Sequence, residues 1–125
     1  MISKVGQIML YVNDQDESVK FWTEQLGFAV IAEEDNQQGF RWIEIAPTKD
    51  AETSIIPHIK AFVSKMSPGL NLDTPSLMFF TDKFDQLHRE LKEKTTVGEI
   101  VNMPSGRVFN FADNEDNYFA VMEKK

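Results

Sequence analysis

Glu44 is the residue in this sequence whose surroundings most strongly suggest chemistry. It lies between Ile43 and Ile45 in an otherwise apolar stretch. Because side chains alternate between the two faces of a strand, Glu44 points away from the face that the isoleucines occupy. A carboxylate in such a place can act as a general base or hold a cationic ligand. The alternative is an ion pair with Arg41 or Arg107, and we expect Arg107 to serve structure rather than catalysis.

The two histidines and the cysteine content set further limits. His58 follows Pro57 at the end of a predicted strand, where it can line the mouth of a pocket or be an ordinary strand-end residue. His88 lies within a predicted helix, and we expect it on the solvated face. The sequence has no cysteine, which excludes disulfides, thiolate nucleophiles and thiolate metal ligands. We therefore expect a cytoplasmic protein.

The net charge and hydropathy of the chain limit the classes of partner that it can bind. The 125 residues carry a net charge of −7, which argues against nucleic acid, because phosphate binding needs clustered lysine and arginine. No apolar run approaches the roughly 20 residues of a membrane span, and the first residues do not resemble a signal peptide. We therefore expect neither nucleic acid nor a membrane as a partner.

Hydrophobic patterning predicts strand, helix and three strands, twice over. The first set comprises a strand at 7–12, a helix at 16–26, and strands at 28–32, 40–46 and 53–58, with a polar turn at 33–39. The second comprises a strand at 76–81, a helix at 83–94, and strands at 96–101, 106–112 and 117–123. This predicts one domain of two modules, at about 1–58 and 75–125, joined by a linker at about 59–74.

The two halves also align residue by residue as a weak internal repeat. At one constant spacing, Ile8–Tyr11 matches Leu77–Phe80, Asp16 matches Asp85, and Trp22 matches Leu91. At a different spacing, Trp42–Ile45 matches Tyr118–Val121.

Several short segments give the chain a family resemblance. They are Ile8–Val12, Ser18 with Phe21-Trp22, Leu26-Gly27-Phe28, Gly106-Arg107, Phe111-Ala112-Asp113 and Asp116-Asn117. In these segments the chain resembles the vicinal oxygen chelate superfamily of glyoxalase I, bleomycin-resistance proteins, fosfomycin-resistance enzymes and extradiol dioxygenases. The resemblance implies an α+β fold of two βαβββ modules, whose curved mixed sheets surround a central cavity. It also implies a homodimer.

The same resemblance implies where a metal would bind. Metal-dependent members place one ligand on the first strand and one on the last strand of each module. The resemblance implies that these positions are Gln7, Glu44, Ser76 and Ala120 here. Divalent transition metals prefer imidazole and carboxylate ligands, and Glu44 is the single strong ligand in this set. We therefore expect no metal and no other cofactor.

Strand alternation from these positions predicts a pocket lining. The predicted ligand-binding residues are Gln7, Met9, Tyr11, Trp42, Glu44, Ser76, Met78, Phe80, Tyr118 and Met122. Methionines adapt to varied shapes and aromatic rings stack on planar or cationic groups, so we expect an aromatic or cationic ligand. The alternative is that these side chains simply form a core.

Three functions are consistent with this lining. We favour a metal-free, small-molecule-binding protein of the glyoxalase/bleomycin-resistance type. The second is an enzyme of lyase, isomerase, dioxygenase or thiol transferase type, with Glu44 as base or a non-standard metal site. The third is a domain whose pocket has decayed and which serves protein interaction.

Overall fold

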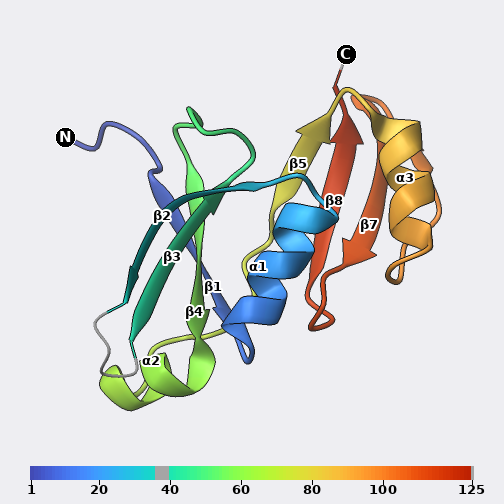
Figure 1. Ribbon diagram of the computed structural model, residues 1–125. Coiled ribbons are helices and arrows are strands. Elements are labelled where there is room, and N and C mark those ends of the chain that lie inside the picture. Colours follow the sequence, from blue (N-terminus) through green and yellow to red (C-terminus); the bar gives the residue numbers. More distant parts are fainter. Residues whose placement is uncertain (36–39, 125) are drawn as a thin grey trace. The chain divides into compact units, whose positions relative to one another are not determined.

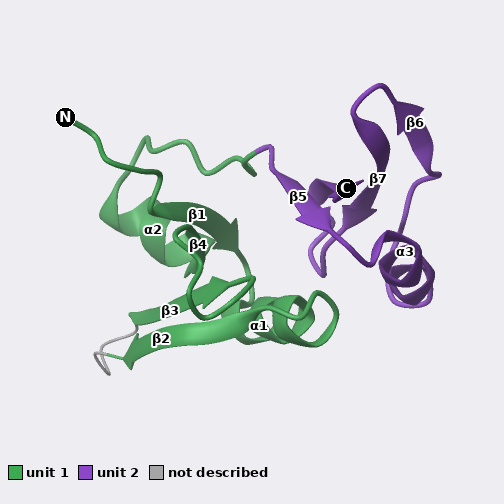
Figure 2. Cartoon of the chain, turned by 90° about the horizontal axis from the view of Figure 1, so that it is seen from above, with its two compact units in different colours: residues 1–75 green, residues 76–125 purple. Residues whose placement is uncertain are grey.

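The computed structural model of the chain describes residues 1–35 and 40–124, so the predicted turn at 33–39 lies partly outside the described residues. The chain divides into two compact units, residues 1–75 and 76–125 (Figure 2). Each unit is one four-stranded mixed sheet with helices. The predicted α+β fold with two βαβββ modules is confirmed.

The described residues of unit 1 form six helices and strands (Figure 1). They are β1 (Gln7–Val12), α1 (Gln15–Glu24), β2 (Ala29–Asp35), β3 (Arg41–Ala46), β4 (Ser54–Ile59) and α2 (Lys60–Met66). The sheet order is β1-β4-β3-β2, with β1 parallel to β4 and the other neighbours antiparallel. The predicted linker at 59–74 therefore begins with a helix, α2, that the sequence patterning did not indicate.

Local interactions fix both ends of α1. Asp14 caps its N-terminus by accepting a hydrogen bond from the Glu17 amide at 3.0 Å. At the other end, Gly27 has a φ of +75°, which suits a residue without a side chain. This lets the Phe28 amide donate to the Trp22 carbonyl at 3.1 Å, and the chain leaves the helix toward β2.

Alternation along the strands of unit 1 separates its two sheet faces. Leu10, Val12, Ile43 and Ile45 are almost fully buried. The residues that alternate with them along the same strands, such as Met9, are only partly buried. One face is therefore core, together with Phe21 and Trp22 of α1, and the opposite face is open.

Unit 2 repeats this arrangement with five elements. They are β5 (Met78–Thr81), α3 (Phe84–Lys92), β6 (Val101–Met103), β7 (Gly106–Ala112) and β8 (Tyr118–Glu123), in the sheet order β5-β8-β7-β6. The core face carries Phe109, Phe111, Phe119 and Val121. Phe84 of α3 packs on Phe109, with ring centroids 5.1 Å apart.

The prediction of a strand at 96–101 is wrong. Val97 makes an isolated bridge to Phe111, the Gly98 amide donates to the Asn110 carbonyl, and β6 begins only at Val101. β-branched residues favour extended backbone, but a strand also needs a continuous partner, and β7 pairs continuously only with β6 and β8.

The sheet orders also correct part of the internal repeat. They make β3 equivalent to β7 and β4 equivalent to β8, so matching Trp42–Ile45 with Tyr118–Val121 is wrong. The correct match pairs Arg41-Trp42-Ile43-Glu44-Ile45-Ala46 with Arg107-Val108-Phe109-Asn110-Phe111-Ala112. In this alignment the counterpart of Glu44 is Asn110.

The two arginines of the repeat hold equivalent places. Arg41 pairs with Asp16 of α1 and, at 3.1 Å, with Glu33 of β2. Arg107 binds both carboxylate oxygens of Asp85 on α3, at 3.1 and 3.0 Å, and also pairs with Glu123. We call these pairings the arginine clamps. They tie each helix to its sheet, as expected for Arg107, and the Arg107 guanidinium lowers the pKa of Asp85.

Among the described residues, no helix is both long and apolar enough to cross a membrane.

Candidate functional site

The open face of unit 1 brings together the residues predicted there. In the parallel pairing of β1 and β4, Gln7 lies opposite Ser54, Met9 opposite Ile56, and Tyr11 opposite His58. Paired residues share a face of the sheet. Of the predicted residues in this unit, Gln7 is exposed, whereas Met9, Tyr11, Trp42 and Glu44 are half-buried.

Glu44 has a hydroxyl partner rather than an arginine. The Ser54 hydroxyl donates a hydrogen bond to a Glu44 carboxylate oxygen. Arg41 binds Asp16 and Glu33 instead, so the expected alternative of an ion pair between Arg41 and Glu44 is wrong. Arg107 binds Asp85 and Glu123 within unit 2. Ser54 is buried, and it thereby holds a half-exposed carboxylate in place on the open face.

An aromatic cluster adjoins this carboxylate on the same unit. The His58 ring lies 6.3 Å from that of Tyr11, 6.2 Å from Phe40 and 5.4 Å from Trp42, between centroids. Phe40 also contacts Phe62 of α2 at 5.3 Å. We call these five residues the aromatic cluster. Burial lowers the pKa of His58, so its ring is neutral at pH 7 and can stack on planar groups.

Three residues of this site, Ser54, Phe40 and Phe62, were not predicted from the sequence. Ser54 and Phe40 could have been found by extending the two-residue alternation along β4 and β3, which would have added Ser54 to His58 and Phe40 to Trp42 and Glu44. Phe62 had no such signal, because its place depends on the packing of α2.

In unit 2 the predicted residues also share one face, but they are more exposed. Strand pairing places Met78 beside Ala120 and Phe80 beside Met122. Phe80 is 63%, Tyr118 55% and Met78 45% exposed, whereas Met122 is only 9% exposed. Met122 therefore lies at the base of this face rather than at its surface.

A hollow of about 280 Å³ lies on the same face of unit 2. Its lining residues are Ser76, Leu77, Asn110, Tyr118, Phe119 and Ala120. The predicted positions Ser76, Tyr118 and Ala120 are thus brought together, and Asn110 is an addition. The pattern Arg-x-apolar-x-apolar-Ala, which occurs at 41–46 and again at 107–112, is the sequence signal that could have identified Asn110 as the counterpart of Glu44.

His88 is more than a solvated helix residue. It is half-buried, its Nε2 lies 3.1 Å from the Gly98 carbonyl oxygen, and its ring packs edge-on against Phe109 at 4.8 Å. His88 therefore helps hold the segment before β6 against α3 and β7.

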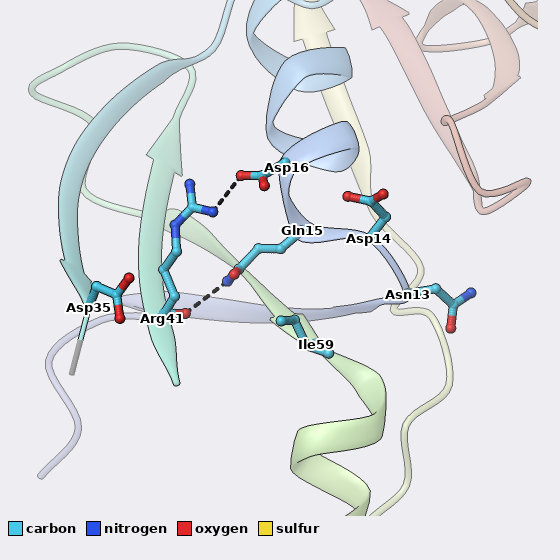
Figure 3. Close-up of a pocket in the computed structure, with 7 residues that line it drawn as sticks. All are labelled: Asn13, Asp14, Gln15, Asp16, Asp35, Arg41 and Ile59. Carbon is cyan, nitrogen blue, oxygen red and sulfur yellow. Dashed lines mark hydrogen bonds and ion pairs between the residues drawn. The ribbon is translucent and has the colours of Figure 1, made fainter. Parts of the chain in front are cut away.

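A larger open pocket of about 450 Å³ lies at the start of α1. Its lining comprises Asn13, Asp14, Gln15, Asp16, Asp35, Arg41 and Ile59 (Figure 3). Gln15 is buried, and its amide donates to the carbonyls of Arg41 and Pro57, each at 2.8 Å. Because Arg41 and Gln15 are used to fasten α1 to β3 and β4, we assign this pocket to the fold.

The family-implied metal positions do not fit a divalent metal. The last strand of unit 1 is β4 rather than β3, so the residue opposite Gln7 is Ser54. Glu44 lies on the neighbouring strand β3, and its carboxylate accepts a hydrogen bond from Ser54. Ala120 has no side-chain atom that could bind a metal. Within the described ranges, no three histidine, aspartate or glutamate side chains gather as a metal site.

Comparison with known proteins identifies relatives over the whole chain. The family model described as Glyoxalase/Bleomycin resistance protein/Dioxygenase superfamily matches residues 4–121. The uncharacterized protein YetH of Bacillus subtilis (strain 168) is 30% identical over 98% of this chain and 100% of its own length.

Solved structures agree with this match. TnmS3, described as an antibiotic binding protein from Streptomyces sp. CB03234, is 28% identical, with a TM-score of 0.80 over 99% of this chain and 98% of its own. A superfamily member from Sphaerobacter thermophilus DSM 20745 has a TM-score of 0.81 over 98% of both chains. At 22% identity, it supports the fold alone.

Proposed function

Because this chain belongs to the Glyoxalase/Bleomycin resistance protein/Dioxygenase superfamily, we propose that it is a metal-free, small-molecule-binding protein. The ligand is a planar aromatic compound that carries a cationic or hydrogen-bond-donating group. The observation that carries the proposal is the aromatic cluster beside the Glu44 carboxylate on the open face of unit 1. The description of TnmS3 as an antibiotic-binding protein supports the same class of function.

Each part of this face has a defined task in the proposal. Tyr11 and Trp42 supply ring faces for stacking, and Met9 supplies an adaptable apolar contact. Glu44 accepts hydrogen bonds from the ligand's polar group, and Ser54 limits the carboxylate to one orientation. Pre-ordering of this kind lowers the entropy lost on binding.

A charge-matched probe series tests the proposal. The probes are 2-naphthylmethylammonium, 2-naphthamide and 2-naphthoate, which share a ring system and differ in charge. In ¹H–¹⁵N NMR titrations at pH 7, we expect the ammonium probe to shift the resonances of Tyr11, Trp42 and Glu44 most. Glu44→Gln should weaken its binding about fivefold, since an ion pair close to the surface is worth about 1 kcal/mol.

The control is Glu24→Gln, which removes the same charge from an exposed site on α1. It should leave the affinity for the ammonium probe unchanged. If Glu44→Gln and Glu24→Gln have the same effect, only net charge matters, and Glu44 is not part of the site.

The hydroxyl partner of Glu44 supports a second candidate, an enzyme with Glu44 as general base. A fixed, half-exposed carboxylate beside a ligand face has the geometry that proton abstraction requires. Turnover of methylglyoxal with glutathione, lost in Glu44→Gln, would favour this candidate over binding alone.

The proposal also includes a cytoplasmic homodimer. The exposed apolar residues Val101 and Met103, on the edge strand β6 of unit 2, support association, because exposed apolar residues at a sheet edge commonly mark interaction sites. Light scattering at micromolar concentration should give twice the mass of one chain, and a monomeric mass would contradict the dimer.

A further inference from the structure

The hollow in unit 2 arises from one difference between the two halves. Ile56 is the parallel partner of Met9, and Ala120 is the parallel partner of Met78, so Ile56 and Ala120 are equivalent positions. Ile56 is fully buried in the middle of its sheet. Unit 2 has the much smaller Ala120 at this position, so the side chains around Ala120 enclose a hollow on the sheet surface.

The polar residue beside this position differs as well. One step along the antiparallel pairing of Ile45 with Ile55 places Glu44 beside Ile56. In unit 2, Asn110 lies directly opposite Ala120. The equivalent of the Glu44 carboxylate is therefore an uncharged carboxamide at the edge of the hollow.

The polar groups around the hollow are available to a ligand. In the part of the chain that the structure describes, the side chains of Ser76, Asn110 and Tyr118 make no hydrogen bond. The Asn110 carboxamide can donate and accept at once, and the two hydroxyls can do either. No lining residue is charged, so nothing there offsets the desolvation of an ionised group.

From these observations we propose that the hollow over Ala120 is a second binding subsite, selective for an uncharged polar group such as a carboxamide, a carbonyl or a phenol. Asn110 makes a paired hydrogen bond to a carboxamide, or a single hydrogen bond to a carbonyl oxygen or a phenol hydroxyl. Tyr118 and Met78 contact the attached ring. The inference rests on the proposed small-molecule-binding function and adds a second chemical preference to it. Unit 1 selects a cationic or donating group through Glu44, and unit 2 selects a neutral group through Asn110.

The same probe series tests this subsite by NMR. Titration with 2-naphthamide should shift the Asn110 side-chain amide and the backbone resonances of Ser76 and Ala120. The 2-naphthoate anion should leave these signals in place at millimolar concentration. Asn110→Leu should weaken 2-naphthamide binding at the hollow about fivefold, the usual effect of losing a hydrogen bond between uncharged groups.

Two further variants address the shape and the charge of the hollow. Ala120→Ile restores the side chain that unit 1 has at this position and should abolish the shifts, because the isoleucine fills the hollow. Asn110→Asp should reverse the preference of unit 2, so that the ammonium probe shifts Ser76 and Ala120. The matched control is Asn102→Leu, since Asn102 is exposed and pairs with Arg107 on the opposite face.

The outcomes separate the two proposals. Shifts confined to Tyr11, Trp42 and Glu44 would overturn the subsite and leave the proposed function standing. Shifts at the hollow that are equally strong in Asn110→Leu and Asn102→Leu would also overturn it. Absence of any shift with all three probes at millimolar concentration would overturn both proposals.

Discussion

The two units share the arginine clamps on the helix side of each sheet. They differ on the other, open face of the sheet. Arg41 and Arg107 hold equivalent positions and bind equivalent aspartates, Asp16 and Asp85. On the other side of the same strands, Glu44 in unit 1 is replaced by Asn110 in unit 2. The comparison indicates that one face of each sheet is set by the requirements of folding, whereas the other is open to specialisation.

The largest expected effect tests whether each unit depends on its own core. Trp22 and Leu91 occupy matching helix positions and are both fully buried. Trp22→Ala should cost about 3–5 kcal/mol of unfolding free energy and Leu91→Ala about 2–5 kcal/mol. Hydrogen exchange should rise mainly in the unit that carries the change, and an equal rise in both units would show that they unfold as one.

A smaller effect concerns the pH dependence of unit 1. Burial lowers the pKa of His58 below its ordinary 6.5, so the unfolded chain takes up a proton at a higher pH than the folded one. Stability from the neutral ring is therefore fully present above pH 6.5 and is lost as the pH falls through the folded pKa. Urea unfolding between pH 7.5 and 5 should show this decline, and His58→Phe should reduce it, because phenylalanine keeps an aromatic ring and takes up no proton.

Unit 2 should respond to pH in the opposite sense. Asp113, in the turn between β7 and β8, accepts hydrogen bonds from the amides of Glu115 and Asn117, but burial is the larger influence and raises its pKa. The resulting stability is present below the unfolded pKa near 3.8 and is lost as the pH rises through the folded value. Asp113→Asn keeps an acceptor oxygen and should flatten this dependence, measured by urea unfolding from pH 3.5 to 6; an unchanged slope would assign it to another group.

The smallest effect is expected from metal ions. Among the residues that the structure describes, neither open face offers a set of strong ligands, so Zn²⁺ or Mn²⁺ should not stabilise the folded state by mass action. Treatment with EDTA, and then addition of either metal, should each change the Tm by less than about 1 °C. Stoichiometric metal in the purified protein would contradict the proposed metal-free function.

Much of the fold could be predicted because local signals were strong. β7 has the bounds expected from its apolar pattern, at Gly106–Ala112. The predicted helix at 16–26 is present as α1, although it ends earlier, at Glu24. The strand at 96–101 failed because extended propensity does not provide continuous pairing. The segment bridges β7 at Val97 alone, and continuous pairing with β7 begins at Val101.

The candidate site could be predicted only in part. Alternation found Met9, Tyr11, Trp42 and Glu44 because it needs no knowledge of neighbouring strands. The partner of Glu44 could not be found in this way, since Ser54 approaches it through the pairing of β3 with β4. The repeat was misaligned at β8 for a similar reason, because apolar strands resemble one another and sheet order alone distinguishes them.

The arginine clamps have a consequence for how such a protein can change over time. If the two halves descend from one duplicated segment, each copy inherited a complete fastening between helix and sheet. Alternation then leaves every second residue of β3 and β7 free to mutate without loosening that fastening. Trp42 could diverge from Val108, and Glu44 from Asn110, while both copies continued to fold. A duplicated fold of this kind can explore two ligand chemistries in a single chain.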